Sequence, residues 1–382
     1  MTHSRPGPVD ARTSTGSAIP VDTCAPGIWQ YSQLLGLDPA SAYLSLGESM
    51  TPVVDDAGLA SALELGRVVL KLDSLCPTGS FKDRAVAGGV AAAIAQGRRG
   101  LVCASSGNAA ASAAAYGARA GVPVILVMPA HTPVGKISAS AAYGAHVLLV
   151  DGDYSVSYHV ARELARTREL VNVTTTYVNP HAVAALRSVA YDLFRQLPTV
   201  PDAVVVPTSS GPLVHGVVAG YADLVDRGLV ARGPRVIAAQ PAGCAPVTRA
   251  FLEGEEQVRE WEQVDTTVSG LDDPLRGYAA DGTRTLQAIR ASGGAAIAIP
   301  DEVSDTGRAE LAARAGVHAE PAGSIGVAAL PALVADGLLA PGEQVACLIT
   351  GNGMKRPLTP DIDPVVAADA DAAIAASAQW FD

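Results

Sequence analysis

Apolar residues along the chain gather in short continuous runs, and alanine-rich stretches separate most of these runs. A run without polar alternation is typical of a strand that is buried on both faces of a sheet. The runs lie at 67–73, 100–105, 123–129, 145–151, 202–208, 235–240, 295–300 and 344–350. Because helical stretches lie between most of them, the pattern predicts a parallel α/β fold.

The predicted strands divide into two groups, which favours two sheets over one closed barrel. The chain has no internal repeat and no long linker, so we expect one domain to be inserted in the other. Residues 85–185 are expected to form the smaller α/β domain, and residues 21–84 and 186–382 the larger one. Residues 1–20 lack the apolar core of a secretory signal and are expected to form a loose tail. The alanine-rich end at 365–382 is either a helix that packs on a partner subunit or a terminal extension without that role.

Composition limits the functions that remain open. With 382 residues, 49% of them hydrophobic and 17% charged, the chain is long and apolar enough for two packed domains. A net charge of −11 without a dense Lys/Arg cluster argues against nucleic acid or acidic membrane as a partner. The five cysteines include no C-x-x-C pair, so neither a disulfide framework nor a metal site is expected. We expect reduced, buried thiols in a cytoplasmic protein.

One lysine stands at the start of a predicted helix, in the segment PTGSFKDR at 77–84. Ser80 is expected to cap that helix, which puts Lys82 at the positive end of the helix dipole. Partial burial and the dipole both disfavour the charged amine, so the pKa of Lys82 should fall below its usual value of about 10.4. A neutral amine attacks carbonyl carbon, as in a Schiff-base lysine. The alternative is an exposed helix lysine.

A second loop, after the strand expected at 100–105, offers an anion site. Ser105, Ser106 and Gly107 precede an alanine-rich helix, whose free N–H groups suit the carboxylate of an amino acid. The amide of Asn108 could reach a ring oxygen of a cofactor. The alternative is an ordinary helix cap.

Together, PTGSFKDR and SSGN resemble the pyridoxal-phosphate enzymes of fold type II, and the S-F-K-D-R form is most similar to threonine synthase. The likeness covers most of the chain, because six further segments before and after these two occur in the family's order. They are GIWQYSQLL, LGESMTPVV, RVIAAQPAGCAPV, AIRASGGAAIAIPDE, AEPAGSIGVAAL and LITGNGMKRP. The resemblance implies pyridoxal 5'-phosphate as cofactor, bound with a small amino-acid substrate between the two domains. It also implies a homodimer.

The resemblance assigns roles to individual residues. Lys82 would hold the cofactor as a Schiff base and then move protons, and Asn108 would contact the cofactor's 3'-oxygen. Ser105, Ser106 and Gly107 would hold the substrate carboxylate. Thr350 would contact the pyridine nitrogen; without the other motifs, it would be interpreted as a threonine that caps a turn. The segment Glu320-Pro321-Ala322 would lie near the cofactor or merely cap a helix.

The chain departs from the family pattern on the cofactor side and on the substrate side. Where relatives carry a Gly/Asn-rich phosphate loop, this chain has Thr208, Ser209, Ser210 and Gly211, followed by a proline that lacks an N–H group. These residues can still supply hydroxyl and N–H donors to the cofactor phosphate, so the loop is expected to be rebuilt rather than lost. A tight turn after a buried strand is the alternative.

The second departure is on the substrate side. In NPHAVAALRS at 179–188, alanines and Arg187 stand where threonine synthases usually have E-G-x-K-T. The resemblance places Asn179 near the substrate and leaves Arg187 as a substitute phosphate ligand or as a helix-surface residue. Lys136 is kept, but Ala139 and His146 stand where larger polar or basic residues are expected.

The leading hypothesis is therefore a threonine synthase-like lyase, which converts O-phospho-L-homoserine and water to L-threonine and phosphate. The alternative is β-elimination or β-replacement on serine, threonine or their phosphate esters. A catalytically silent, ligand-binding relative is the hypothesis of another class. It predicts the loss of Lys82, Asn108 or Thr350, and all three are present.

Overall fold

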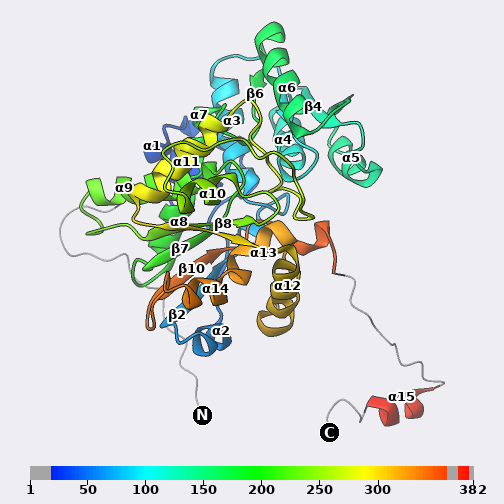
Figure 1. Ribbon diagram of the computed structural model, residues 1–382. Coiled ribbons are helices and arrows are strands. Elements are labelled where there is room, and N and C mark those ends of the chain that lie inside the picture. The colour runs from blue at the N-terminus through cyan, green and yellow to red at the C-terminus, as the bar shows by residue number, and fades with distance from the viewer. Residues whose placement is uncertain (1–18, 359–368, 378–382) are drawn as a thin grey trace.

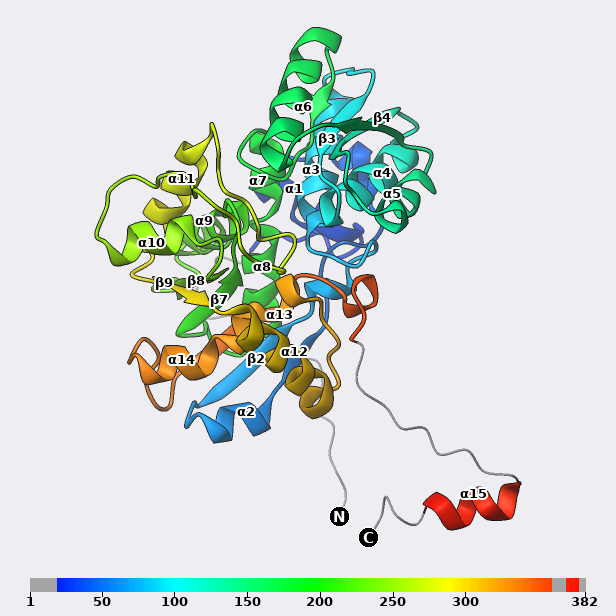
Figure 2. The ribbon, with the colours of Figure 1, turned by 45° about the vertical axis from the view of Figure 1, so that its right-hand side comes forward.

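The computed structural model describes residues 19–358 and 369–377, and two α/β domains dominate it (Figures 1 and 2). The larger domain holds a six-stranded sheet in the order β1-β2-β10-β7-β8-β9, and the smaller a four-stranded sheet in the order β5-β4-β3-β6. All strand pairs are parallel except β1 with β2. The predicted parallel α/β fold with two sheets is confirmed.

Each predicted run contains a strand. The strands of the large sheet are β1 (Val53–Asp55), β2 (Arg67–Lys71), β7 (Ala203–Pro207), β8 (Arg235–Pro241), β9 (Ala295–Ile299) and β10 (Gln344–Leu348). The strands of the small sheet are β3 (Leu101–Ala104), β4 (Val124–Pro129), β5 (His146–Val150) and β6 (Val171–Asn172). The four strands of the small sheet all lie within 85–185, and the six strands of the large sheet all lie outside that range.

Three strands differ from expectation. β1 and β6 were not predicted, because strands of three and two residues leave no apolar run that a sequence pattern can reveal. β5 was expected to be buried on both faces but is an edge strand whose residues are all partly or fully exposed.

Helices cover both faces of the large sheet. One face packs against α8 (Ser188–Gln196), α9 (Pro212–Asp226), α10 (Pro246–Leu252) and α11 (Ala279–Ala291). The other packs against α2 (Ala57–Ala62), α12 (Asp301–Ala315), α13 (Pro321–Ala328) and α14 (Leu330–Ala335). In the small domain α4 (Asn108–Ala120) and α6 (Tyr154–Arg168) pack on β3 and β4, and α5 (Val134–Ala141) lies by β5. The core on the first face continues into the small domain, so the two domains share one apolar interior.

The remaining elements lie near the ends of the chain or between the domains. Near the N-terminus are η1 (Gly27–Tyr31), α1 (Ser32–Leu35), η2 (Pro39–Leu44) and η3 (Asp73–Leu75), and η4 (Gly353–Lys355) follows β10. The expected loose tail at 1–20 lies almost wholly outside the described residues. At the C-terminus α15 (Ala370–Ser377) is a helix that stands apart from both domains in Figures 1 and 2.

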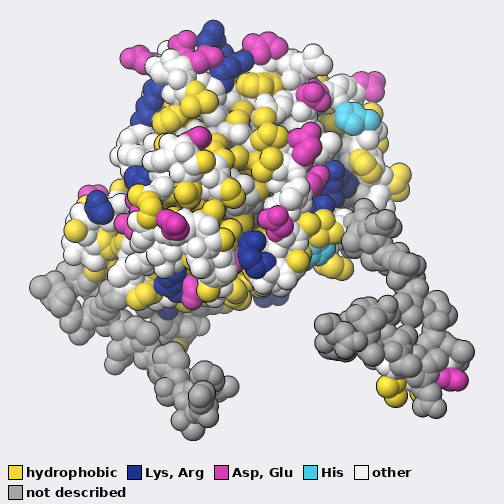
Figure 3. Space-filling model, turned by 60° about the horizontal axis from the view of Figure 1, so that its bottom comes forward, with side chains coloured by type: hydrophobic (Ala, Val, Ile, Leu, Met, Phe, Trp, Pro, Cys, Tyr) yellow, Lys and Arg dark blue, Asp and Glu magenta, His cyan; other side chains and the backbone are white. Residues whose placement is uncertain are grey.

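The surface and the cysteines add two observations. On the face shown in Figure 3, basic and acidic side chains are interspersed. Cys24 is exposed, which corrects the expectation that all thiols are buried, whereas the other four cysteines are buried and free. Within 19–358 and 369–377, no helix combines the length and the apolar character needed to cross a bilayer.

The helix α3 (Lys82–Ala95) packs closely against α7 (Pro180–Ala185), the helix that leads back to the large domain. A Cβ atom added at Gly88 would lie 2.5 Å from Cβ of Ala185 and 3.0 Å from the carbonyl oxygen of His181. The two helices can therefore approach this closely only because residue 88 has no side chain.

Replacing Gly88 with valine should push α3 and α7 apart and lower the free energy of unfolding by about 1–3 kcal/mol, the usual cost of overpacking. Urea unfolding followed by circular dichroism measures the change. Ala95→Val, at an exposed position of the same helix, is the matched control and should cost only a few tenths of a kcal/mol. Equal stability of the two variants would contradict the close packing.

Candidate active site

A cavity of about 820 Å³ lies between the two domains. Its small-domain wall comes from the loop between β3 and α4 and from the region of α5. Its large-domain wall comes from the start of α3, the loop between β7 and α9, a loop at 267–273, and the segments around residues 320 and 350. Predicted site residues from both domains line this cavity: Lys82, Ser105, Ser106, Gly107, Asn108, Ser209, Ser210, Gly211, Glu320, Pro321, Ala322 and Thr350.

Lys82 is the first residue of α3 and is half-buried at the cavity wall. Burial lowers the pKa of Lys82 to about 8, and the carboxylates of Asp273 and Glu320 oppose part of that shift. At neutral pH a useful fraction of the amine is therefore uncharged. The expected cap is wrong: Phe81 occupies the cap position, and the hydroxyl of Ser80 is buried without a hydrogen-bond partner in the described chain.

The start of α3 has no side-chain cap, but hydrogen bonds to Asp83, the residue after Lys82, hold it in place. Asp83 accepts the backbone N–H of Thr78 at 2.7 Å and the Thr78 hydroxyl at 2.6 Å, so its carboxylate reaches back to the turn before the helix. The same carboxylate accepts the hydroxyl of Ser112 on α4 at 2.6 Å. Lys82 is therefore positioned by a contact that links the two walls of the cavity.

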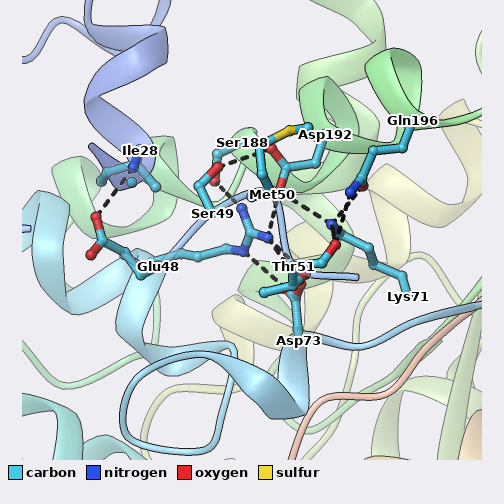
Figure 4. A network of polar contacts seen from close by, with 12 residues as sticks. Ile28, Glu48, Ser49, Met50, Thr51, Lys71, Asp73, Ser188, Asp192 and Gln196 are labelled. Atoms are coloured by element: carbon cyan, nitrogen blue, oxygen red, sulfur yellow. Dashed lines mark hydrogen bonds and ion pairs between the residues drawn. The ribbon is translucent and has the colours of Figure 1, made fainter. Parts of the chain in front are cut away.

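A buried charge network holds the next residue, Arg84, and Figure 4 labels three of its members, Lys71, Asp73 and Asp192. The Arg84 guanidinium donates to Asp73 at 2.9 Å and to Asp192 at 2.7 Å, and the ammonium of Lys71 lies 3.3 Å from Asp192. Tyr31 also donates to Asp192, at 2.7 Å. Burial by itself would raise the pKa of Asp192, but Arg84 and Lys71 outweigh that effect and hold it at about 2.

The loop between β3 and α4 is the expected anion site. The Ser105 hydroxyl accepts the backbone N–H of Gly107 at 3.1 Å, and Gly107 is the residue before α4. The side chain of Asn108 reaches across to the large domain, where its amide donates to Glu320 and its oxygen accepts Lys355 at 2.7 Å. Burial raises the pKa of Glu320.

The loop before α9 forms a cradle that suits a phosphate. Gly211 adopts a left-handed conformation with φ 92°, and a Cβ atom there would lie 2.2 Å from Thr285. Within the described chain, no acceptor takes the backbone N–H groups of Ser209, Ser210 and Gly211. These free donors lie at the N-terminus of a 15-residue helix, where the dipole also favours an anion.

Main chain also forms the floor of the cavity near Thr350, which follows β10 and is buried. The Thr350 hydroxyl donates to the carbonyl oxygen of Ala322 at 3.4 Å. A Cβ atom at Gly323 would lie 2.6 Å from the carbonyl oxygen of Gly351, and one at Gly351 would lie 1.9 Å from Glu320. The contact with main chain therefore requires glycine at 323, whereas a side chain at 351 would displace the Glu320 side chain.

Three predicted site residues do not line the cavity. The Thr208 hydroxyl turns back to the carbonyl oxygen of Val206, at 2.7 Å. Asn179 caps α7 through the N–H groups of residues 181 and 182. Arg187 lies 3.2 Å from Asp223 in an ion pair on the helix surface. The positions of these residues give no support to a phosphate role for Arg187 or a direct cofactor role for the Thr208 side chain.

On the small-domain side, Lys136 and Ala139 line the cavity, whereas His146 is exposed at the start of β5. Sequence reasoning gave no role to Asp272, Asp273, Lys355 and Arg356, which also line it. Lys355 and Arg356 belong to the same segment, LITGNGMKRP, as Thr350, so their proximity to Thr350 was the available signal. The aspartates lie in an irregular loop, where no pattern indicates which side chains turn inward.

Comparisons with known proteins agree with this geometry. A sequence profile described as "Pyridoxal-phosphate dependent enzyme" matches residues 44–351. Threonine synthase of Methanosarcina acetivorans is 29% identical over 90% of this chain and 85% of its own, and that of Mycobacterium bovis is 32% identical over 84% and 90%. The crystal structure of maize serine racemase superposes with a TM-score of 0.70 at 21% identity, covering 86% of this chain and 94% of that one.

The charge network generates a stability prediction. Asp192→Asn leaves Arg84 and Lys71 buried with one counter-charge fewer and should lower the free energy of unfolding by about 3–5 kcal/mol. Because the pKa of Asp192 is lowered in the folded protein, the ionised carboxylate contributes to the free energy of unfolding at every pH above the unfolded-state pKa of about 3.9. The contribution is lost as the pH falls through about 2.

Urea unfolding at pH 7 tests this prediction. Asp226→Asn, an exposed position at the end of α9, is the matched control and should change the free energy of unfolding by less than about 0.5 kcal/mol. A loss below about 1 kcal/mol in Asp192→Asn would show that the network is not the anchor described here.

Proposed function

Because the chain belongs to the family of pyridoxal-phosphate dependent enzymes, we propose that it is a lyase that converts O-phospho-L-homoserine and water to L-threonine and phosphate. The observation that carries the proposal is the lowered pKa of Lys82 in the same cavity as the phosphate cradle. Similarity to threonine synthases over most of the chain supports the choice of reaction.

The residues present fit the cofactor at both ends. The free N–H groups of Ser209, Ser210 and Gly211 would hold its phosphate, and the Thr350 hydroxyl would face the pyridine nitrogen. Lys82 would hold its aldehyde carbon. When bound, pyridoxal phosphate withdraws electrons from the substrate's Cα and so makes the Cα proton acidic.

The protein's own groups then divide the work. Ser105, Ser106 and Gly107 would bind the substrate carboxylate at the start of α4. The Lys82 amine would remove the Cα proton and return it at the end of the reaction. Enclosure between two domains would keep bulk water away from the reacting atoms.

The substrate phosphate needs cations that Arg187 does not supply. Lys136, Lys355 and Arg356 line the cavity, and we propose them as the phosphate ligands of this chain. We also propose a cytoplasmic homodimer. The four buried free cysteines support the location, and resemblance to the family supports the dimer.

One observation favours a second candidate, β-elimination or β-replacement on O-phosphoserine or O-phosphothreonine. Ala182, Val183 and Leu186 make an apolar wall in the stretch that departs from the threonine synthase pattern. A shorter substrate would leave room beside this wall for a nucleophile other than water.

The assay that tests the proposed function supplies O-phosphohomoserine to the cofactor-loaded protein and follows phosphate and threonine. The two products should appear in equal amounts, and Lys82→Ala should abolish both. Lys136→Met should raise KM more than it lowers kcat, because it removes a binding charge and no proton transfer. Phosphate released from O-phosphoserine but not from O-phosphohomoserine would favour the second candidate.

Cofactor uptake should depend on pH through Lys82. Only the neutral amine attacks the aldehyde, so the rate of uptake by the cofactor-free protein should rise as the pH approaches about 8 and level off above it. Stopped-flow absorbance of added pyridoxal phosphate measures that rate. A midpoint near the ordinary lysine value of about 10.4 would contradict a lowered pKa of Lys82.

A further inference from the structure

A loop of the large domain, residues 269–278, brings two carboxylates into the cavity that Lys82 lines. Asp273 is 7% exposed and lies close enough to Lys82 for its charge to act on the lysine's pKa. Asp272 lines the same cavity but is exposed. Within the described chain neither carboxylate forms an ion pair, which is unusual for a buried aspartate.

Only one oxygen of Asp273 is committed. Its Oδ1 accepts the hydroxyl of Tyr278 and, at 3.1 Å, the backbone N–H of Leu275. Leu275 is fully buried with φ 60°, a left-handed conformation that costs a non-glycine residue about 1–2 kcal/mol. The loop therefore keeps a strained turn that orients this carboxylate. No donor in the described chain bonds Oδ2, so that oxygen is free for a molecule in the cavity.

The loop is fastened to the small domain as well. Arg276 forms an ion pair with Asp153, the residue that caps α6. The ring of Tyr278 stacks on Tyr158 of α6, with centroids 4.1 Å apart and planes at 27°. Tyr278 thus donates a hydrogen bond to Asp273 through its hydroxyl and packs on the small domain through its ring. Asp273 is held relative to both walls of the cavity.

We propose that Asp273 is a second acid–base group of this site, a catalytic residue that takes the proton of the water attacking the substrate's Cβ. The inference rests on the proposed function. Before that addition, phosphate leaves Cγ with the electron pair of its C–O bond, and the proton lost from Cβ is returned to Cγ, which leaves a double bond between Cα and Cβ. The water oxygen then bonds to Cβ as one of its O–H bonds breaks, and Cα takes its proton back from Lys82. The water proton passes to Oδ2 of Asp273 and from there through solvent to the released phosphate, which balances the charge.

The surroundings suit Asp273 to this role. Burial raises its pKa to about 6, so at pH 7 it is ionised yet basic enough to accept a proton. Asp272 and Asp281 raise the pKa further, and the hydrogen bond from Tyr278 lowers it. The other titratable groups that sense its charge are Lys82, Tyr154, Tyr158 and Cys244. Two groups with pKa values of about 6 and 8 can then handle the side-chain and Cα protons separately.

The test separates the two proton transfers. Asp273→Asn should lower threonine formation from O-phosphohomoserine about 100-fold or more, the usual worth of a general base. It should leave Lys82-dependent exchange of the Cα proton of L-threonine in D2O, followed by NMR, within about threefold of wild type, because that step needs no water activation. The matched control is Asp265→Asn, an exposed position in the same connection between α10 and α11, and should change neither rate.

A pH profile adds a readout that a structural role would not move. The acid limb of kcat/KM should fall near pH 6 in wild type and should move to higher pH in Tyr278→Phe. That variant keeps the stacked ring but loses the hydrogen bond that favours the ionised carboxylate.

The outcomes are distinct. Full threonine formation by Asp273→Asn, or an equal loss of threonine formation and Cα exchange, would overturn the role of Asp273 and leave the proposed function intact. An unmoved acid limb in Tyr278→Phe would count against it in the same way. Wild-type protein that makes no threonine from O-phosphohomoserine would overturn the proposed function and this inference with it.

Discussion

The candidate site depends on a buried network of two cations and two anions at the first turn of α3. Lys71 and Arg84 meet Asp73 and Asp192 where almost no solvent reaches. Such groups cost a great deal to bury separately, so the network holds only if each charge keeps its partner. It joins the consecutive elements β2, η3 and α3 to α8, which lies about a hundred residues further along the chain. Lys82 inherits its position from that junction, since it lies two residues before Arg84.

Most of the fold was predictable because it follows from continuous apolar runs. Every run held a strand, and the two sheets were expected from their grouping. Where the signal is short, prediction failed, as at β1 and β6. The exposure of β5 was missed for another reason, since its apolar sequence cannot reveal that the strand lies at an edge of the sheet.

The candidate site divides in the same way. Lys82, Ser209 and Thr350 belong to contiguous segments, so resemblance to a family could point to them, and they line one cavity. Arg187 was singled out because it stands in place of a family lysine, but its ion pair with Asp223 accounts for its charge elsewhere. The role proposed for Asp273 was missed because it rests on a hydrogen bond from Tyr278, whose ring packs on the small domain, and a local pattern does not encode such contacts.

The glycines around Gly351 have a consequence for how this scaffold can diversify. At the end proposed for the cofactor, the cavity is shaped by main chain, through the contact of Gly323 with Gly351 and through the N–H groups before α9. At the substrate end, it is shaped by side chains such as Ala182 and Asp273. Single substitutions can therefore remodel substrate choice while the cradle proposed for the cofactor phosphate, which is built from main chain, stays as it is.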